Sequence, residues 1–214
     1  MQIKVNLQIF LFIIIFILTH QIGLYALIML FAFIHEFGHI VMGLILKLKP
    51  KSLNIMPFGF TVTFETYEYR KLIEIKKIII ALAGPIVNII IALVISFLNM
   101  NIDLKLLIIY SNIAIAMFNL IPFYPLDGGR ILKSFIKMNS TNSIKADKIV
   151  NKISNVLLIF ITIVSSFAII YIKNIAILFI IIYLWILNII ENKRFNLKKR
   201  AYLALANQNK CIDN

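Results

Sequence analysis

Two histidines and a glutamate stand together in an otherwise apolar stretch, as H-E-F-G-H at residues 35–39. His35 and His39 are four residues apart, so on a helix both imidazoles project from one face. That spacing lets two ring nitrogens bind one zinc ion, while Glu36 is placed to take a proton from water rather than to bind metal. Burying three such groups without a partner is costly, and a structural core histidine does not explain the triplet. We therefore interpret His35 and His39 as zinc ligands.

A third ligand has to come from elsewhere, because catalytic zinc typically has three protein ligands and one open position. The candidate is Asp127, in the sequence N-L-I-P-F-Y-P-L-D-G-G-R at residues 119–130. The prolines break a helix and the glycines allow close backbone approach, so this segment is able to fold back toward the histidines. The alternative is that Asp127 is a turn or N-cap residue before a helix at 129–138.

The elements that must hold these residues are membrane spans. Of the 214 residues, 61% are hydrophobic and 14% are charged, and the mean hydropathy is +0.95. Soluble domains have ~45–50% apolar and ~25% charged residues, so a water-soluble domain is excluded. The single cysteine, Cys211, excludes an internal disulfide framework. Apolar runs of about the length that crosses a bilayer predict six spans, at about 6–20, 22–46, 77–98, 105–123, 153–172 and 175–190, of which the first and the sixth are short.

The basic residues predict the orientation of these spans. The formal net charge is +13, and all but two of the 22 Lys and Arg lie in the termini and in the loops 47–77 and 124–152. Lys and Arg mark the cytoplasmic side of a membrane protein. We therefore expect both termini and both loops to be cytoplasmic, with the lipid bilayer rather than a nucleic acid as the partner of the basic residues.

The loop 52–66 has a pattern that is unusual for a cytoplasmic connection. Its residues Thr61, Val62 and Thr63 alternate polar and apolar as in a strand, and a proline and a glycine interrupt the chain before them. We expect a short hairpin that dips toward the site, with an edge that pairs with an extended substrate. The predicted fold class is therefore an all-α polytopic membrane protein with six transmembrane helices and a short membrane-re-entrant β-like loop.

Two further predictions concern the third span and the bounds of the domain. Gly84-Pro85 lies inside the third predicted span, where it is either a packing kink or the hinge of a lateral gate. The six-span domain is expected at 1–192, followed by a basic cytoplasmic tail at 193–214.

With these motifs the chain resembles the site-2 proteases, the intramembrane zinc metalloproteases of peptidase family M50. That family combines H-E-x-x-H on one span with N-x-x-P-x-x-x-x-D-G on a later one, and both stand here in order, at 35–39 and 119–128. The sequence A-G-P-I-V-N at 83–88 resembles the family's G-P segment. M-P-F-G-F-T-V at 56–62 and the segment 119–130 are most similar to the sporulation branch of the family. The resemblance covers roughly residues 20–190.

The resemblance implies a role for each motif residue. His35, His39 and Asp127 would hold one zinc ion, and Glu36 would be the general base. Asn119, at a helix break, would contact the substrate or the developing oxyanion, with a helix–helix hydrogen bond as the alternative. Pro122 and the strand residues Thr61, Val62 and Thr63 would line the substrate path.

The same resemblance implies a membrane-associated protein substrate, cleaved near the cytoplasmic face. A sigma-factor precursor of the pro-sigma-K type, processed during sporulation in a bacterial cell membrane or the membrane around the forespore, is the first expectation. An anti-sigma factor or a signal-peptide remnant is the alternative substrate, and a non-proteolytic metal-binding protein or transporter is the alternative of another class. Membrane inhibitory partners and a homo-oligomer stay open. The better-known sporulation relatives carry a nucleotide-sensing CBS domain, for which the tail 193–214 is too short.

Overall fold

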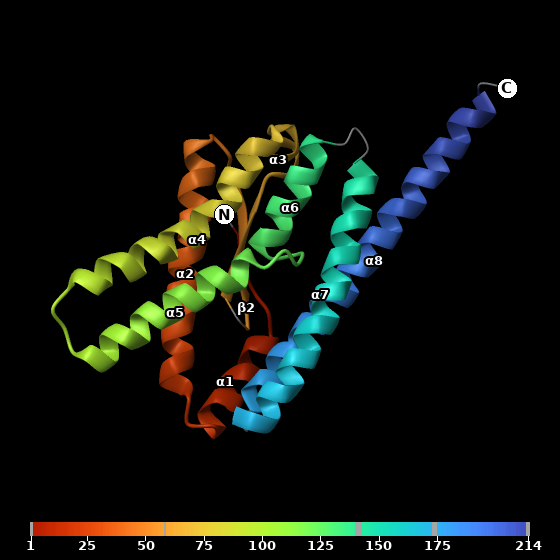
Figure 1. Cartoon of the computed structure of the whole chain (residues 1–214). Coiled ribbons are helices and arrows are strands. Elements are labelled where there is room, and N and C mark those ends of the chain that lie inside the picture. Colours follow the sequence, from red (N-terminus) through yellow and green to blue (C-terminus); the bar gives the residue numbers. More distant parts are fainter. Residues whose placement is uncertain (1, 58, 140–142, 173–174, 213–214) are drawn as a thin grey trace. The chain divides into compact units, whose positions relative to one another are not determined.

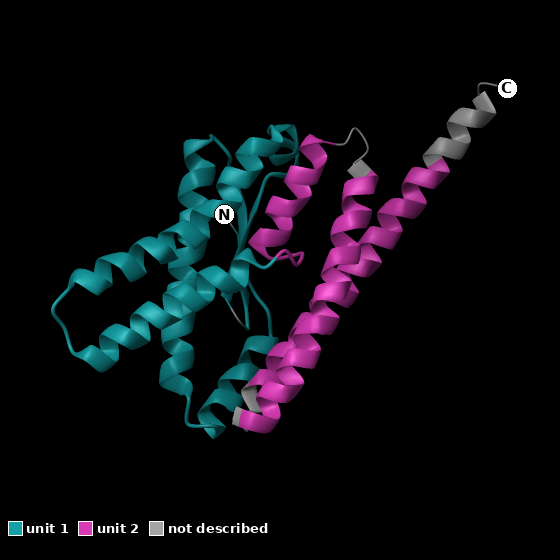
Figure 2. Ribbon diagram, in the orientation of Figure 1, with its two compact units in different colours: residues 1–121 teal, residues 122–214 magenta. Residues whose placement is uncertain are grey.

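The computed structural model describes residues 2–57, 59–139, 143–172 and 175–212. They belong to two compact units, Met1–Ile121 and Pro122–Asn214 (Figure 2). The elements, labelled in Figure 1, are β1 (Gln2–Val5), α1 (Gln8–Leu18), α2 (Ile22–Ile45), β2 (Pro50–Met56), β3 (Gly59–Phe64), α3 (Thr66–Lys71), α4 (Glu74–Phe97), α5 (Ile102–Leu120), α6 (Asp127–Met138), α7 (Ser143–Ile172) and α8 (Ile175–Ile212).

A small sheet lies in the first unit. Its strand order is β1-β2-β3, with β1 parallel to β2 and β3 antiparallel to it. The hairpin between β2 and β3 closes at the pair Met56 and Gly59, and Gly59 adopts a φ of +138°, which suits glycine. The predicted hairpin is thus confirmed. Strand β1 was not predicted, because four residues are too few to give an alternation signal, and the chain is helical with a sheet rather than all-α.

Small residues let α2 pack closely against its neighbours in the first unit. A methyl group added at Gly38 would lie 2.9 Å from the carbonyl oxygen of Ala83 in α4, and one added at Gly43 would overlap the ring of Phe64 in β3. Glycine commonly allows this close approach between membrane helices. Helix α4 also packs against α5, with which it forms a helical hairpin (Figure 1). These contacts bring α4 and β3 to the H-E-x-x-H face of α2.

Polar side chains join the two long helices of the second unit. Asn188 Nδ2 of α8 donates to Asn155 Oδ1 of α7 at 2.7 Å, and Asn192 Nδ2 donates to the same oxygen at 3.2 Å. Trp185 Nε1 donates to Thr162 Oγ1 at 3.1 Å. Interhelical hydrogen bonds of this kind hold apolar helices together where burial from water provides little driving force. They fix α8 against α7 along their apolar stretches.

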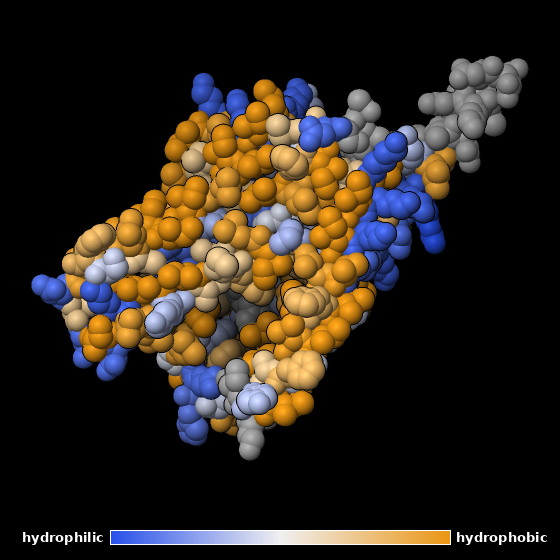
Figure 3. All heavy atoms as spheres, in the orientation of Figure 1, coloured by the Kyte–Doolittle hydropathy of each residue, from blue (hydrophilic) through white to orange (hydrophobic). Residues whose placement is uncertain are grey.

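Four helices of the described chain are long and apolar enough to span a membrane. They are α2, α4, α5 and the segment Ile144–Tyr171 of α7. Apolar side chains dominate the visible surface of α4 and α5 (Figure 3). On α4 the exposed large apolar residues are Ile75, Ile79, Ile86, Ile89, Ile90, Leu93, Val94 and Phe97. Such faces suit contact with lipid chains.

The prediction of six spans is not confirmed. The first predicted span corresponds to α1, which has 11 residues, about 17 Å at ~1.5 Å per residue and too short for a ~30 Å hydrocarbon core. It ends early because His20 turns the chain with a φ of +55°. The sixth predicted span opens α8, where the side chains of 172–176 lie outside the described residues. Helix α8 continues to Ile212, so the start of a separate tail at 193 stays a prediction.

Candidate metal centre

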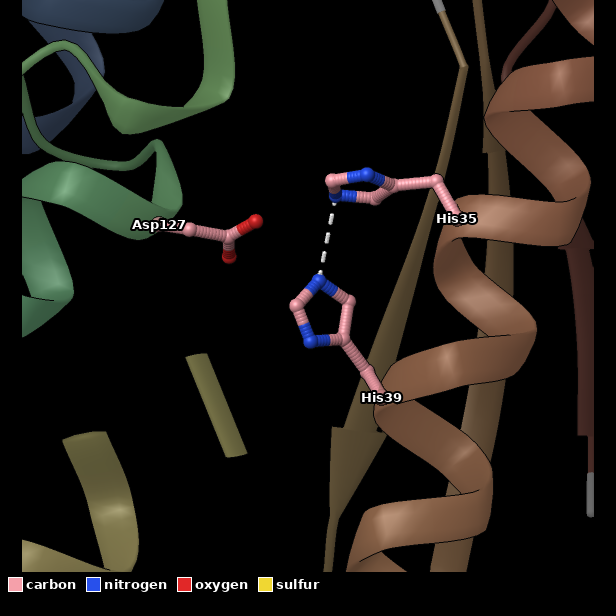
Figure 4. A group of neighbouring side chains, drawn as sticks. All are labelled: His35, His39 and Asp127. Atoms are coloured by element: carbon pink, nitrogen blue, oxygen red, sulfur yellow. Dashed lines mark hydrogen bonds between the residues drawn. The ribbon is translucent and has the colours of Figure 1, made fainter. Parts of the chain in front are cut away.

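The two histidines of α2 form a close pair. Their rings project from successive turns of the helix, and the two Nε2 atoms lie 3.2 Å apart (Figure 4). Both side chains are buried. Two imidazole nitrogens bound to one tetrahedral zinc ion at ~2.0–2.1 Å would be about 3.3 Å apart. The pair therefore has the spacing that a shared zinc ion requires.

The remaining ring nitrogens of the pair are both engaged by α4. His39 Nδ1 donates to the backbone carbonyl of Ile80 at 2.7 Å, and His35 Nδ1 lies 2.6 Å from Asn88 Oδ1. A carbonyl or amide oxygen only accepts, so each Nδ1 acts as the donor, and Nε2 is the nitrogen with which each ring could bind a metal ion. Metal-binding histidines characteristically have such a partner on the second nitrogen. Two lone pairs that face one another are stabilised by a cation between them.

Gly84 of α4 leaves the space in front of this pair open. A methyl group added at this position would lie 2.6 Å from His35 Nε2 and would also overlap His39 Nε2. The sequence suggested a kink or a hinge for Gly84-Pro85, whereas the structure gives the glycine a separate role. It keeps a side chain out of the space in front of the two Nε2 atoms.

We expect Gly84→Ala to weaken zinc binding, because its methyl group would compete with the ion for this space. The loss should be on the order of 10- to 100-fold in affinity, as for other disturbances of the surroundings of a metal ligand. Competition with a fluorescent chelator would measure it. Gly23→Ala, where a methyl group would meet nothing within 4 Å, is the matched control. Equal affinities for the two variants would contradict this role.

Glu36 lies between the histidines and contacts the sheet. It is buried, and its Oε1 accepts a hydrogen bond from the backbone N–H of Val62 in β3. Val62 is also part of a core with Leu48, Phe64 and Ile80, which fixes the strand against α2 and α4. One of the predicted strand residues, Val62, thus contacts the predicted base Glu36, and it does so through its backbone N–H rather than its side chain.

The flanking threonines of β3 are engaged differently. Thr63 Oγ1 and Ser52 Oγ form a 2.7 Å hydrogen bond, and Thr61 Oγ1 donates to Met56 Sδ at 3.7 Å. Both contacts go to β2, the neighbouring strand. Of the three strand residues named from sequence, Val62 is therefore the one that makes a hydrogen bond to α2.

Asp127 belongs to the second unit, where it is the first residue of α6. The helix begins there rather than at 129, and its N-cap position is Leu126, with no side-chain capping bond. Asp127 is buried, and its Oδ1 lies 3.7 Å from Arg130 Nη1. The alternative of an N-cap role for Asp127 is thus not what the structure has. A carboxylate in the first turn is stabilised by the helix dipole.

The start of α6 is held by its own surroundings in the second unit. A methyl group added at Gly129 would lie 2.5 Å from the backbone nitrogen of Tyr124, so glycine allows the helix to fold against the preceding segment. The backbone N–H of Tyr124 donates to Ser154 Oγ of α7 at 3.0 Å. Further along, Lys133 pairs with Asp147 of α7 at 2.6 Å. These contacts anchor α6, with Asp127 at its first turn, to α7.

The Lys133 ammonium group responds to this environment. Burial lowers its pKa, but the phenolic oxygen of Tyr124 and the carboxylates of Asp147 and Glu191 favour the charged form, and the pKa is raised overall. The ion pair with Asp147 is therefore kept at neutral pH, so α6 stays attached to α7.

Asn119 and Pro122 differ in what surrounds them. Asn119 Nδ2 donates to the carbonyl of Ile115 in its own helix at 3.0 Å. Pro122 is exposed and follows the end of α5. Their roles toward a substrate stay predictions.

Comparison with known proteins identifies the family. The model of peptidase family M50 matches residues 23–104 and 101–161, which is more than half of the chain. The chain belongs to peptidase family M50. The resemblance noted from its motifs is thereby confirmed.

The relatives of this M50 chain carry matching names. It is 30% identical over 141 residues to a Synechocystis sp. protein with a provisional name as a zinc metalloprotease, covering 62% of this chain and 36% of that protein. It is 31% identical over 122 residues to stage IV sporulation protein FB of Bacillus subtilis, covering 54% and 41%. The chain thus spans about two fifths of these relatives. The names of both relatives agree with the family, one as a zinc metalloprotease and the other as a sporulation protein.

A solved structure supports the fold of the M50 chain. The site-2 protease from Methanocaldococcus jannaschii superimposes with a TM-score of 0.69 at 23% sequence identity, covering 88% of this chain and 89% of that one. At this identity the similarity concerns the fold. It agrees with a helical membrane protein that carries a small sheet.

Proposed function

We propose that this M50 chain is an intramembrane zinc metalloendopeptidase in which His35, His39 and Asp127 bind one zinc ion. Each of the three side chains offers one ligand atom and is buried (Figure 4). Two imidazoles and one carboxylate are a donor set that zinc prefers in hydrolytic sites. The observation that carries the proposal is the His35–His39 pair, whose Nε2 atoms lie 3.2 Å apart on a helix that is long and apolar enough to span a membrane.

The proposed reaction is hydrolysis of a peptide bond. Zinc held by these residues supplies a Lewis acid that polarises the scissile carbonyl and makes a water molecule acidic enough to lose a proton near neutral pH. Glu36 accepts that proton as the water oxygen adds to the carbonyl carbon, and delivers it to the amine nitrogen as the C–N bond breaks. Before a substrate binds, the backbone N–H of Val62 donates a hydrogen bond to the Glu36 carboxylate and orients it.

A route for the substrate follows from the sheet. Strand β3 has β2 as its neighbour on one side, and the Val62 N–H on its other edge points to Glu36. A peptide extended along that edge would add a strand to the sheet and have its backbone beside Glu36. Because a helix hides its backbone bonds, a helical substrate would need to unwind there before cleavage.

Val62→Pro tests the docking edge. Successive N–H groups of a strand point to opposite edges, so those of Thr61 and Thr63 face β2 and that of Val62 does not. Proline is tolerated where the N–H does not belong to the ladder, so the hairpin should remain. We expect cleavage to fall at least about tenfold, since an oriented hydrogen bond to a charged group contributes ~1.5–3 kcal/mol, while zinc content stays unchanged. Wild-type cleavage by Val62→Pro would argue against docking at this edge.

The proposed substrate is a membrane-associated sigma-factor precursor of the pro-sigma-K type, cleaved near the cytoplasmic face during sporulation. The support is the similarity to stage IV sporulation protein FB. The basic residues that favour cytoplasmic termini support the orientation. An anti-sigma factor or a signal-peptide remnant is the second candidate, because the Synechocystis relative carries the broader name of a zinc metalloprotease.

Co-expression tests the substrate directly. The intact chain and its Glu36→Gln variant would be produced in a bacterial host together with a pro-sigma-K-type precursor, a single-span anti-sigma factor or a signal-peptide remnant. A shortened sigma precursor that appears with the intact chain alone would support the first substrate. If the anti-sigma factor or the signal-peptide remnant were shortened instead, the sigma-factor precursor would be rejected as the substrate in favour of that protein.

A further inference from the structure

A chain of buried amide groups in the first unit ends on one of the candidate zinc ligands. Asn112 of α5 accepts at Oδ1 from Asn88 Nδ2 of α4 at 2.8 Å, and Asn88 Oδ1 lies 2.6 Å from His35 Nδ1 of α2. Neither asparagine is exposed to any extent. Three helices are thus connected by two hydrogen bonds that no water reaches.

The direction of this chain is fixed at its far end by the backbone. Asn112 Nδ2 donates to the carbonyl oxygen of Ile108, one turn earlier in α5, at 2.9 Å. A backbone carbonyl only accepts, so the amide of Asn112 must turn its NH₂ to Ile108 and its oxygen to Asn88. Asn88 must then present its NH₂ to Asn112 and its oxygen to His35. His35 Nδ1 can satisfy that oxygen only as a donor.

The reverse orientation of Asn88 is disfavoured from two sides. Its Nδ2 also faces the Phe31 carbonyl oxygen of α2 at 3.5 Å. A flipped amide would place its oxygen against the oxygens of Phe31 and Asn112, in a buried environment where like partial charges repel strongly. It would also turn an NH₂ group toward His35 and favour the tautomer with the proton on Nε2, the nitrogen that faces His39. Such a tautomer has no lone pair for a metal ion on that side.

We propose that Asn112 is a positioning residue of the zinc centre, which sets the tautomer of His35 through Asn88 although it does not contact the histidine. The inference rests on the proposed function in one respect, the assignment of His35 as a ligand. It predicts that a substitution of Asn112 in α5 lowers the zinc affinity of the histidine pair in α2.

The test compares Asn112→Leu, which removes both polar atoms at similar size, with Asn112→Asp, which keeps an acceptor for Asn88. We expect Asn112→Leu to bind zinc about 10- to 100-fold more weakly, as measured by competition with a chelator, and Asn112→Asp to lie much closer to the wild type. Asn155→Leu makes the same replacement at an interhelical hydrogen bond between α7 and α8 in the second unit, and should leave zinc affinity unchanged. If Asn112→Leu does not fold, Asn112→Ala takes its place.

A second measurement reads the tautomer itself. The chain has three histidines, so a protein labelled with ¹⁵N at histidine and freed of zinc gives few ring signals to assign, through the His35→Gln and His39→Gln variants. We expect His35 to carry its proton on Nδ1 in the wild type, and a mixture of tautomers in Asn112→Leu. A general loss of packing would weaken the fold without moving this equilibrium.

The outcomes separate the inference from the proposed function. Wild-type affinity and tautomer in Asn112→Leu, with weakened zinc binding in Asn88→Leu, would overturn the role of Asn112 and leave the zinc site standing. Unchanged zinc binding in His35→Gln would contradict the proposed function itself. Loss of affinity in Asn112→Leu, a mixed tautomer and recovery in Asn112→Asp together would support the inference.

Discussion

Glu36→Gln is expected to abolish peptide-bond cleavage while the protein keeps its zinc. Glutamine has nearly the shape of glutamate and can still accept the hydrogen bond from the Val62 N–H, but it cannot take a proton from water. General acid–base catalysis by a positioned side chain typically contributes 10²- to 10⁴-fold in rate, so we expect a loss of at least about a thousandfold. The measurement is the cleavage rate of a membrane-embedded substrate in proteoliposomes, with metal analysis of the same samples.

Glu65→Gln is the matched control for this variant. Glu65 is exposed and lies just beyond β3, so the same replacement there should leave cleavage unchanged. If Glu36→Gln retained a tenth or more of the wild-type rate, Glu36 would not be the base. If Glu36→Gln lost its zinc as well, the residue would act on the metal site rather than as a base.

Asp127→Ala is expected to reduce zinc affinity by several orders of magnitude. The proposed site has three protein ligands, and removal of one leaves two imidazoles, which hold zinc weakly. The structure adds that Asp127 does not serve as the N-cap of α6, since Leu126 occupies that position. The carboxylate is therefore not explained by helix capping. Equilibrium dialysis against buffered zinc would measure the loss, and circular dichroism would check the fold.

Asp103→Ala provides the comparison for Asp127→Ala. Both residues lie in the first turn of a helix, but Asp103 is exposed and Asp127 is buried. The helix dipole stabilises both carboxylates in a similar way, so an effect on helix stability should appear in both variants. Loss of zinc confined to Asp127→Ala supports the third ligand, and equal zinc content in the two variants would remove Asp127 from the site.

The histidine pair was the feature that the sequence predicted best. A spacing of four residues in an apolar run implies one helix and one shared face, and both are local properties of the chain. The hairpin around Thr61–Thr63 was predicted for the same reason, because alternation over a few residues is a local signal. Short-range patterns therefore gave α2, β2 and β3 close to their observed positions.

What the sequence missed depends on contacts between distant segments. Alternation does not say which edge of β3 carries the N–H groups that point away from β2, so the contact from Val62 to Glu36 was not foreseen. Gly84 and Asn112 have no local signal for their roles, because each acts through a neighbouring helix. Asn88 lay in a segment noted for its resemblance to the family, yet its partners were unknown until α2, α4 and α5 were packed.

The number of spans shows the limit of hydropathy. The apolar run at 6–20 was already short for a span, and because the chain turns at His20, the resulting helix, α1, has 11 residues. Hydropathy counts apolar residues without recording where a helix ends. The same limit applies to α6, which begins at Asp127 rather than at 129 because Gly129 lets it pack on Tyr124.

Zinc X-ray absorption of the purified protein tests the central claim most directly, since it reads the ligands themselves. For the wild type we expect two imidazole nitrogens and oxygen ligands at ~2.0–2.1 Å from zinc. Under limiting zinc, His39→Ala should show one imidazole fewer in whatever metal it retains. A sulfur ligand at ~2.3 Å, or an unchanged spectrum in His39→Ala, would show that zinc binds elsewhere and would contradict the account.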